Sequence, residues 1–135
     1  MADKPMNIFD IAGRAMSAQL VRLNATASNL ANAGSVSGSE GQAYRAIRPV
    51  FQTVVDKPGV ATVKVDKVVS SDTPATKRHD PGHPLADQNG DVWEAGVDSS
   101  AELVDMIESA RMYQNNVQVL QTAKSLLLET IRLGK

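Results

Sequence analysis

Cysteine is absent from the 135-residue sequence, and aromatic side chains make up only 4% of it. The first absence excludes a disulfide scaffold, cysteine-based zinc sites and thiol catalysis. The second leaves little material for a base-stacking surface or an aromatic ligand pocket. An excess of positive charge is also missing, because 14 basic and 15 acidic side chains give a net charge of −1. Binding of nucleic acid, which needs a concentrated basic surface, is therefore not expected.

Long hydrophobic runs are missing as well. No segment approaches the ~20 apolar residues that span a bilayer, so we do not expect a membrane-spanning chain. Residues 1–20 contain no apolar core of signal-peptide length, because Asp10 and Arg14 interrupt the apolar residues there. We expect a soluble protein that is either cytoplasmic or exported without a cleavable signal peptide. The length fits one domain, or one small domain with extended arms.

Residues 1–33 are expected to provide an N-terminal helix that begins near Asn7. Asn7 suits the N-cap, Asp10 is its capping-box partner, and Gly34 offers a C-terminal stop. Arg22 is the one charged residue between positions 15 and 33. Apolar residues recur at intervals of three and four, which places them on one face of the helix. This face comprises Phe9, Met16, Leu20, Leu23, Ala27 and Leu30.

Residues 98–135 are expected to provide a second, longer helix from about Asp98 to Gly134. Acidic side chains gather in its first turns and basic ones near its end, an order that complements the helix dipole. Between Glu108 and Glu129 no carboxylate occurs, and amides take most of the polar positions. The apolar face changes register once along its length. It comprises Leu103, Met106, Ile107, Ala110, Tyr113, Val117 and Leu120, and then Leu127 and Ile131.

The lengths of these helices bear on the shape of the molecule. About 27 and 36 residues would span roughly 40 and 54 Å, whereas a globule of this chain length has a radius of gyration of about 14 Å. Faces rich in amides and small hydroxyls suit packing against other helices, where a charge is costly to desolvate. We expect an elongated α+β protein with coiled-coil-like terminal helices. The alternative is an ordinary two-helix coiled coil with an amide-rich outer face.

Residues 34–97 are expected to form a small antiparallel β domain with flexible loops. The Gly- and Ser-rich residues 34–41 indicate a flexible connector, and residues 73–84 a proline-rich loop. Pro49 separates two strand-like runs, and Trp93 is expected to be a core anchor. Turns are predicted at Lys57-Pro58-Gly59 and, as a hairpin turn, at Asn89-Gly90. The expected strands are residues 43–48, 50–56, 60–69 and 91–97.

Motifs for catalysis or metal binding are weak. His79 and His83 have a spacing that serves a metal only in a helix, which the intervening proline and glycine oppose. Asp87, Asn89 and Asp91 imitate a calcium loop that lacks the glycine and the closing glutamate such a loop needs. No nucleophile elbow and no phosphate-binding loop occurs. We therefore expect no catalytic residue, no metal and no cofactor, and hence no enzyme.

Several groups of residues resemble one family. The run Ala-Ser-Asn-Leu-Ala-Asn at residues 27–32 resembles the N-terminal signature of bacterial flagellar axial proteins. The run Tyr44-Arg45-Ala46, the segment from Asp80 to Asp87 and the ending from Met106 to Gly134 resemble basal-body rod proteins of the FlgC type. The likeness covers nearly the whole chain in the right order.

The resemblance implies a structural subunit of the proximal rod, which crosses the periplasm and transmits torque. In that family the terminal helices pack into a tube with other rod proteins and copies of the same chain, around an outer middle domain. The resemblance further implies contact with the base of the basal body and export through the flagellar type III apparatus without a cleavable signal peptide. No catalysis is implied. A soluble coiled-coil adaptor is the alternative function.

We expect the function to reside in an assembly interface formed by the two helices. Apolar faces would supply buried surface, and amides would supply lateral hydrogen bonds. Asn29→Ala or Asn32→Ala is expected to impair assembly while leaving the stability of the isolated chain nearly unchanged. The expected interface residues are Phe9, Met16, Leu20, Leu23, Asn24, Ala27, Asn29, Leu30, Asn32, Leu103, Met106, Ile107, Ala110, Tyr113, Gln114, Asn115, Val117, Leu120, Leu127 and Ile131.

Overall fold

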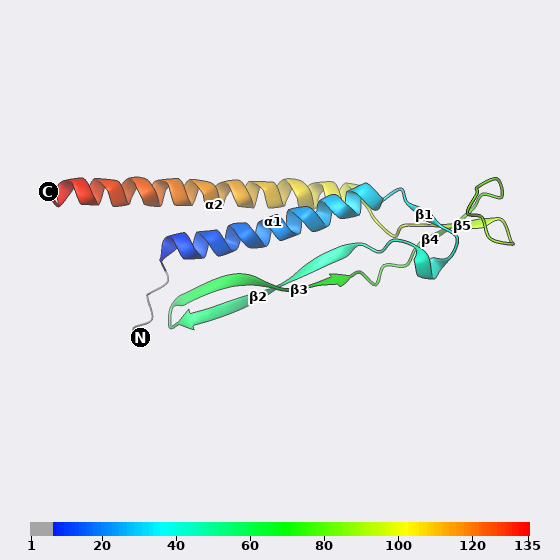
Figure 1. Ribbon diagram of the computed structural model, residues 1–135, viewed down its shortest axis with the longest axis horizontal. Coiled ribbons are helices and arrows are strands. Elements are labelled where there is room, and N and C mark those ends of the chain that lie inside the picture. Colours follow the sequence, from blue (N-terminus) through cyan, green and yellow to red (C-terminus); the bar gives the residue numbers. More distant parts are fainter. Residues whose placement is uncertain (1–6) are drawn as a thin grey trace.

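The computed structural model describes residues 7–135 and contains two long helices at the ends of the chain. Helix α1 spans Ile8–Asn32 and helix α2 spans Ser99–Leu133. The helices pack side by side and run in opposite directions, and α2 continues past the first turn of α1 (Figure 1). The prediction of two terminal helices is confirmed.

Side-chain caps set the starts of both helices. The side chain of Asn7 accepts a hydrogen bond from the backbone N–H of Asp10, and the Asp10 carboxylate accepts one from the N–H of Asn7. At α2, Asp98 accepts hydrogen bonds from the N–H groups of Ser100 and Ala101. Each cap satisfies donors that have no partner within the helix, and such a cap contributes about 1 kcal/mol.

The middle of the chain forms two separate antiparallel sheets, whereas the sequence predicted one β unit. Strands β2 (Ile47–Lys57) and β3 (Val60–Ser70) make a long hairpin that turns at Gly59, which has a φ of +83°. A smaller sheet contains strands β1, β5 and β4 in that order. These strands span Val36–Ser37, Asp91–Glu94 and Thr76–His79.

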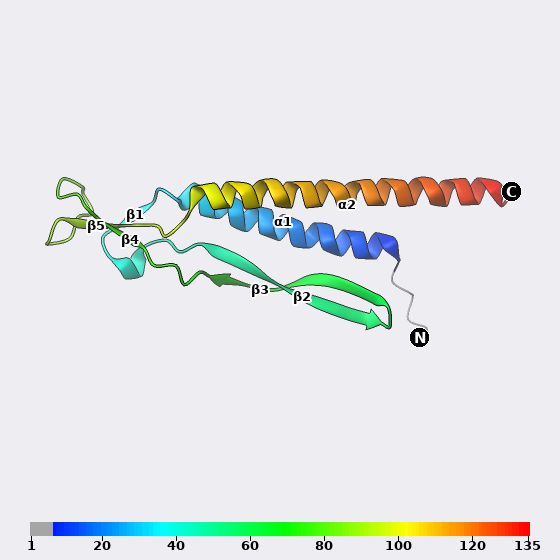
Figure 2. The same ribbon diagram turned by 180° about the vertical axis from the view of Figure 1, so that it is seen from behind.

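The two sheets lie in different places relative to the helices. The hairpin runs along α1 on the side opposite α2, so that α1 forms a middle layer (Figures 1 and 2). The small sheet lies past the end of the helix pair where α1 finishes and α2 begins. The start of the hairpin and the small sheet therefore both lie near the end of α1 and the start of α2.

Several predicted boundaries in the middle of the chain were wrong. Pro49 does not end a strand, because β2 continues through it with a bulge between Val50 and Phe51. A two-stranded hairpin leaves one edge of each strand unpaired, so a residue without an N–H is tolerated there. Residues 34–41 are not simply a connector, since they contain β1 and the start of a 3₁₀ turn at Glu40–Gln42.

The loops that precede β5 also differ from the prediction. The proline-rich segment contains strand β4, which pairs with β5 through His79 and Asp91. The Asn89-Gly90 turn lies directly before β5, but an eleven-residue loop of residues 80–90 joins the two strands instead of a tight hairpin turn. Gly90 has a φ of +77°, a conformation that glycine adopts without strain.

Candidate functional site

Small and polar side chains form the buried faces of the two helices. The buried residues of α1 are Ala12, Ala18, Ala25, Thr26 and Asn29, and those of α2 are Glu102 and Ser109. No large apolar side chain is buried on either described helix. The helix pair therefore leaves much of its apolar surface facing outward.

Large apolar side chains occupy the outer faces of both helices. Leu20, Leu103 and Ile107 are exposed by 46%, 51% and 51%, and Leu127 and Ile131 by 51% and 52%. These five residues belong to the predicted interface, and so does the exposed Phe9. Exposed apolar surface that gathers on one element is typical of an interaction site.

The remaining predicted interface residues differ in exposure. Asn29 alone is fully buried. Four others are exposed, namely Asn24, Ala27, Gln114 and Asn115. The others are half-buried, namely Met16, Leu23, Leu30, Asn32, Met106, Ala110, Tyr113, Val117 and Leu120.

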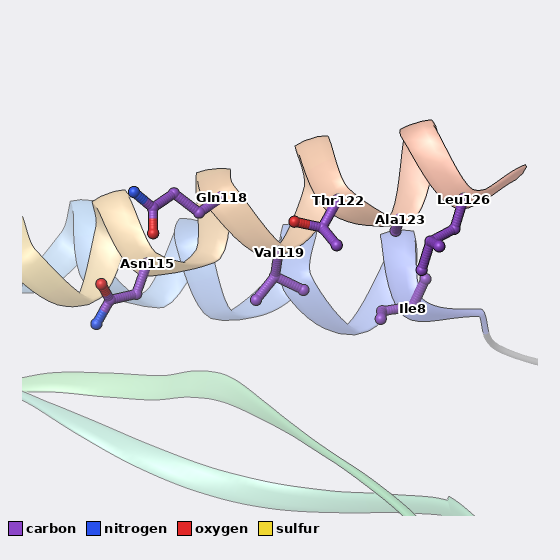
Figure 3. A pocket seen from close by; sticks show the side chains of 7 residues that line it. All are labelled: Ile8, Asn115, Gln118, Val119, Thr122, Ala123 and Leu126. Atoms are coloured by element: carbon purple, nitrogen blue, oxygen red, sulfur yellow. The ribbon is translucent and has the colours of Figure 1, made fainter. Parts of the chain in front are cut away.

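A groove opens along α2 beside the first turn of α1 (Figure 3). Its lining combines apolar side chains with amides and a hydroxyl and contains no charged residue. Ile8, Val119 and Leu126 are exposed by 48%, 42% and 58%. The lining comprises Ile8, Asn115, Gln118, Val119, Thr122, Ala123 and Leu126.

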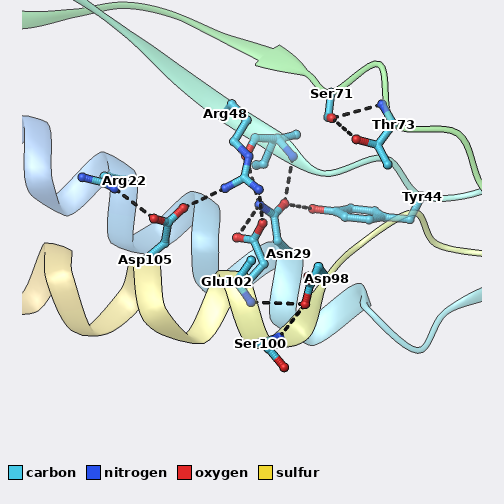
Figure 4. Close-up of polar contacts among 12 residues, drawn as sticks. Arg22, Asn29, Tyr44, Arg48, Ser71, Thr73, Asp98, Ser100, Glu102 and Asp105 are labelled. Atoms are coloured by element: carbon cyan, nitrogen blue, oxygen red, sulfur yellow. Dashed lines mark hydrogen bonds and ion pairs between the residues drawn. The ribbon is translucent and has the colours of Figure 1, made fainter.

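Asn29 lies at the centre of a polar cluster that joins α1, α2 and the segment leading into β2 (Figure 4). Its Oδ1 accepts hydrogen bonds from the N–H of Ile47 at 2.8 Å and from the hydroxyl of Tyr44 at 3.0 Å. Its Nδ2 donates to the carbonyl oxygen of Ile47 and to Oε2 of Glu102, both at 3.0 Å. The amide thus makes all four of the hydrogen bonds available to it.

The charges of this cluster are paired in series. Glu102 is fully buried and forms an ion pair with Arg48 of β2. Arg48 also contacts Asp105 at 3.0 Å, and Asp105 contacts Arg22 of α1 at 3.0 Å. Arg22 extends the series to Glu108 at 3.4 Å. The ionic contacts therefore connect α1, α2 and the hairpin, with a buried carboxylate at their centre.

The position of Asn29 corrects the sequence-based prediction for it. With its side chain fully buried inside the chain, Asn29 has no surface to offer a neighbouring subunit, and its loss is expected to destabilise the chain itself. Asn32 differs, because it is half-buried and its side chain donates to the carbonyl of Ser28 in the preceding turn of the same helix.

Sequence reasoning missed the charged members of the cluster. The sequence predicts only that acidic residues such as Glu102 and Asp105 favour the first turns of a helix. Two features of the sequence do indicate that these charges have partners on other elements. Arg22 is a lone charge on a helix stretch otherwise free of charge, and Glu102 lies four residues before Met106, on the apolar face of α2. A charge on a face that will be covered needs a partner from another element.

The polar residues of the small sheet bind one another. His79 Nδ1 lies 2.9 Å from Asp91, and Asp87 accepts hydrogen bonds from the N–H groups of Asn89 and Asp91. The hydrogen bond from Lys77, at 2.6 Å, is the main cause that lowers the pKa of Asp91, and it raises the pKa of Lys77. Within residues 7–135, no three His, Asp or Glu side chains are grouped to hold a metal ion.

Trp93 is not the core anchor that the sequence suggested. It is half-buried, and the ammonium of Lys77 lies 5.9 Å from the centre of its ring. Val92, the preceding residue of β5, is the fully buried side chain of this sheet. Because side chains alternate between the faces of a strand, the two residues point to opposite sides.

Comparison with known proteins identifies the class. Residues 9–38 match the family model described as flagella basal body rod protein, and residues 88–133 match the model of the flagellar basal body rod FlgEFG protein C-terminal region. These regions contain most of α1 and all of α2, so the helix pair has the features of a flagellar rod protein. Among residues 7–135, neither helix has an apolar stretch long enough to cross a bilayer.

Full-length relatives narrow the class to one family. The chain is 52% identical over 132 residues to the flagellar basal-body rod protein FlgC of Salmonella typhimurium, covering 96% of this chain and 98% of the relative. Its identity to the FlgC proteins of Escherichia coli and Yersinia enterocolitica is 52% and 50%, with the same coverage. The chain belongs to the FlgC family of flagellar basal-body rod proteins, and the resemblance seen in its sequence is confirmed.

Proposed function

We propose that this chain is a structural subunit of the proximal rod that assembles through its terminal helices and transmits torque across the periplasm. Its partners would be copies of itself, other rod proteins and the base of the basal body. Membership of a family of rod proteins supports a structural role and gives no support to an enzymatic one. The soluble coiled-coil adaptor receives no support from this family membership.

The observation that carries the proposal is the outward placement of the large apolar side chains. Helix α2 is ten residues longer than α1, 35 against 25, which corresponds to an extension of about 15 Å. The last part of α2, residues 127–133, is here called the overhang. Its apolar side chains are all exposed: Leu127, Leu128, Ile131 and Leu133. The first three of these share one side of the helix, and exposed apolar surface gathered in this way is typical of an interaction site.

The proposed assembly uses the three parts of the chain differently. Residues 1–33 and 98–135 would form the tube through coiled-coil-like contacts, and residues 34–97 would lie outside it, in an elongated subunit. The predicted interface residues other than Asn29 would supply these contacts. Export through the flagellar type III apparatus without a cleavable signal peptide completes the proposal, and a chain without cysteine suits unfolded passage into the periplasm.

Ile107→Glu tests the proposal on the outer face of α2. Ile107 is half exposed, so the variant is expected to fold normally, as measured by circular dichroism of the purified chain. A charge buried between subunits is costly, so the variant is expected to be lost from purified basal bodies and not to support swimming in cells that lack the native protein. Gln88→Glu adds the same charge on an exposed loop and should behave as the native chain. Normal swimming and normal incorporation of Ile107→Glu would overturn the proposed interface.

A further inference from the structure

The buried carboxylate of Glu102 receives its partners from two different elements. Asn29 of α1 donates to Oε2, and Arg48 of β2 pairs with Oε1. Arg48 is the one cation paired with Glu102 among residues 7–135. The packing of α1 against α2 therefore encloses a negative charge that only the hairpin neutralises.

Such a charge makes the helix contact depend on the hairpin. Enclosing a carboxylate without a cation is strongly unfavourable, and removing one member of a buried ion pair leaves the other uncompensated. We propose that Glu102 makes the pairing of α1 with α2 conditional on the docking of the β2–β3 hairpin. In this arrangement the helices and the hairpin order together as one cooperative unit.

Asn29 adds a second dependence of the same kind. Three of its four hydrogen bonds are made with Tyr44, three residues before β2, and with the backbone of Ile47, the first residue of β2. Without the docked hairpin, the buried amide would keep only its contact with Glu102. Polar groups buried without partners are costly, so both residues oppose a helix pair that forms alone.

A second contact between α1 and the hairpin lacks this property. Arg14 of α1 reaches Asp56 at 3.3 Å and Thr62 at 3.0 Å, near the hairpin turn. The side chains of Arg14 and Asp56 are exposed by 43% and 36%. Neither residue contacts a buried charge on α2 in the described hydrogen bonds and ion pairs. Arg14 therefore provides a matched control for Arg48.

The dependence has a consequence for assembly, and this consequence rests on the proposed function. The outer apolar faces of α1 and α2 form one surface only when the helices are paired. Conditional pairing would present that surface only on a chain whose hairpin has already docked. Terminal helices in an incompletely folded chain would thus lack the surface that neighbouring subunits bind.

Hydrogen exchange of the full-length purified chain, followed by mass spectrometry, tests the coupling. Arg48→Met is expected to lower protection about tenfold to a hundredfold in the hairpin and, equally, in α1 and residues 99–113 of α2, because the pairing of the helices is lost with the docking. Arg14→Met is expected to lower protection only near the hairpin turn. Loss of protection confined to the hairpin in Arg48→Met would overturn the proposal.

A second substitution keeps the test decisive if Arg48→Met does not fold. Glu102→Gln, combined with Arg48→Met, retains an acceptor for Asn29 and removes the uncompensated charge. Protection of the helices is expected to recover in part, by about tenfold relative to Arg48→Met, because the uncompensated charge is gone although Asn29 still lacks Tyr44 and Ile47; protection of the hairpin stays low. No recovery in the double variant would also overturn the proposal. Swimming of Ile107→Glu tests the rod function separately, because that residue lies outside the cluster.

Discussion

The two ends of the helix pair are stabilised in different ways. At the end near the small sheet, Asn29, Glu102 and Arg48 complete one another's hydrogen bonds and charges within the chain. At the other end, α2 continues as an overhang of exposed apolar residues, including Leu127 and Ile131. Polar groups are satisfied only by partners at fixed distances and angles, whereas apolar side chains accept many neighbours. The first end is therefore suited to fix the fold of the chain, and the second has the surface that the proposed assembly requires.

Asn29→Ala is expected to have the largest effect on stability. The substitution removes four hydrogen bonds and leaves Glu102 and the backbone of Ile47 with unmet groups, so the free energy of unfolding should fall by about 2–4 kcal/mol. Urea denaturation of the purified chain measures this change. Asn32 is half-buried and its side chain donates to the carbonyl of Ser28 in its own helix, so Asn32→Ala should change the free energy of unfolding by less than about 0.5 kcal/mol. Equal effects would show that the buried hydrogen bonds of Asn29 are not what stabilises this end of the helix pair.

The contrast between Asn29 and Asn32 also shows how far the sequence alone can predict. Periodicity predicted both helices, and the capping residue Asn7 predicted the start of α1, because these features depend on neighbours within a few residues. The cluster depends on Tyr44 and Arg48 arriving beside α1 from a hairpin whose docking no local pattern specifies. Asn29 and Asn32 look equivalent in the sequence, and only their positions around the helix, set by what packs there, separate them.

The outer faces were more predictable for a related reason. A side chain such as Ile107 remains exposed where the helical period places it, because about half of its surface is left uncovered by residues 7–135. The division of the β region into two sheets was not predicted, since strand pairing over long separations depends on the whole fold. Strand β4 was not predicted, because it lies in a proline-rich segment; Pro74 and Pro81 flank the strand but are not part of it.

Asp98→Ala is expected to have the next largest effect on stability, at the end of the helix pair near the small sheet. Asp98 caps two backbone N–H groups of α2, and its loss should lower the free energy of unfolding by about 1 kcal/mol. Asp98→Asn keeps an acceptor at the same position and should retain most of the stability in the same denaturation experiment. A loss as large in Asp98→Asn as in Asp98→Ala would mean that charge, and not capping, is the cause.

A smaller and local effect is expected when the pH changes at the small sheet. The folded pKa of Asp91 is lowered from its ordinary value of 3.8, chiefly by the hydrogen bond from Lys77. A carboxylate with a lowered pKa stabilises the fold above its unfolded pKa, and this contribution is lost as the pH falls through the folded pKa. The pKa of Lys77 is raised from its ordinary value of 10.5. Its ammonium group therefore stabilises the fold at lower pH, and this contribution is lost as the pH rises through the folded pKa.

Fluorescence of Trp93 measures this local effect, because it is the single tryptophan and lies beside Lys77. Emission is expected to stay constant from about pH 5 to pH 9 and to change below about pH 4. Asp91→Asn should lose the acid transition below pH 4. Persistence of the same acid transition in that variant would assign it to another group.

The smallest effect on stability is expected in the overhang, for the double variant Leu127→Gln with Ile131→Gln. Both side chains are about half exposed, so their replacement should change the free energy of unfolding by less than about 0.5 kcal/mol. Leu120→Gln is the matched control, because Leu120 is half-buried in the helix pair and its replacement should destabilise the chain measurably. The double variant should nevertheless be missing from purified basal bodies, since the overhang would lose two of its four exposed apolar side chains and bury polar amides against its neighbours. If it is instead as unstable as Leu120→Gln, the overhang is covered within its own chain, and the distinction between the two ends does not hold.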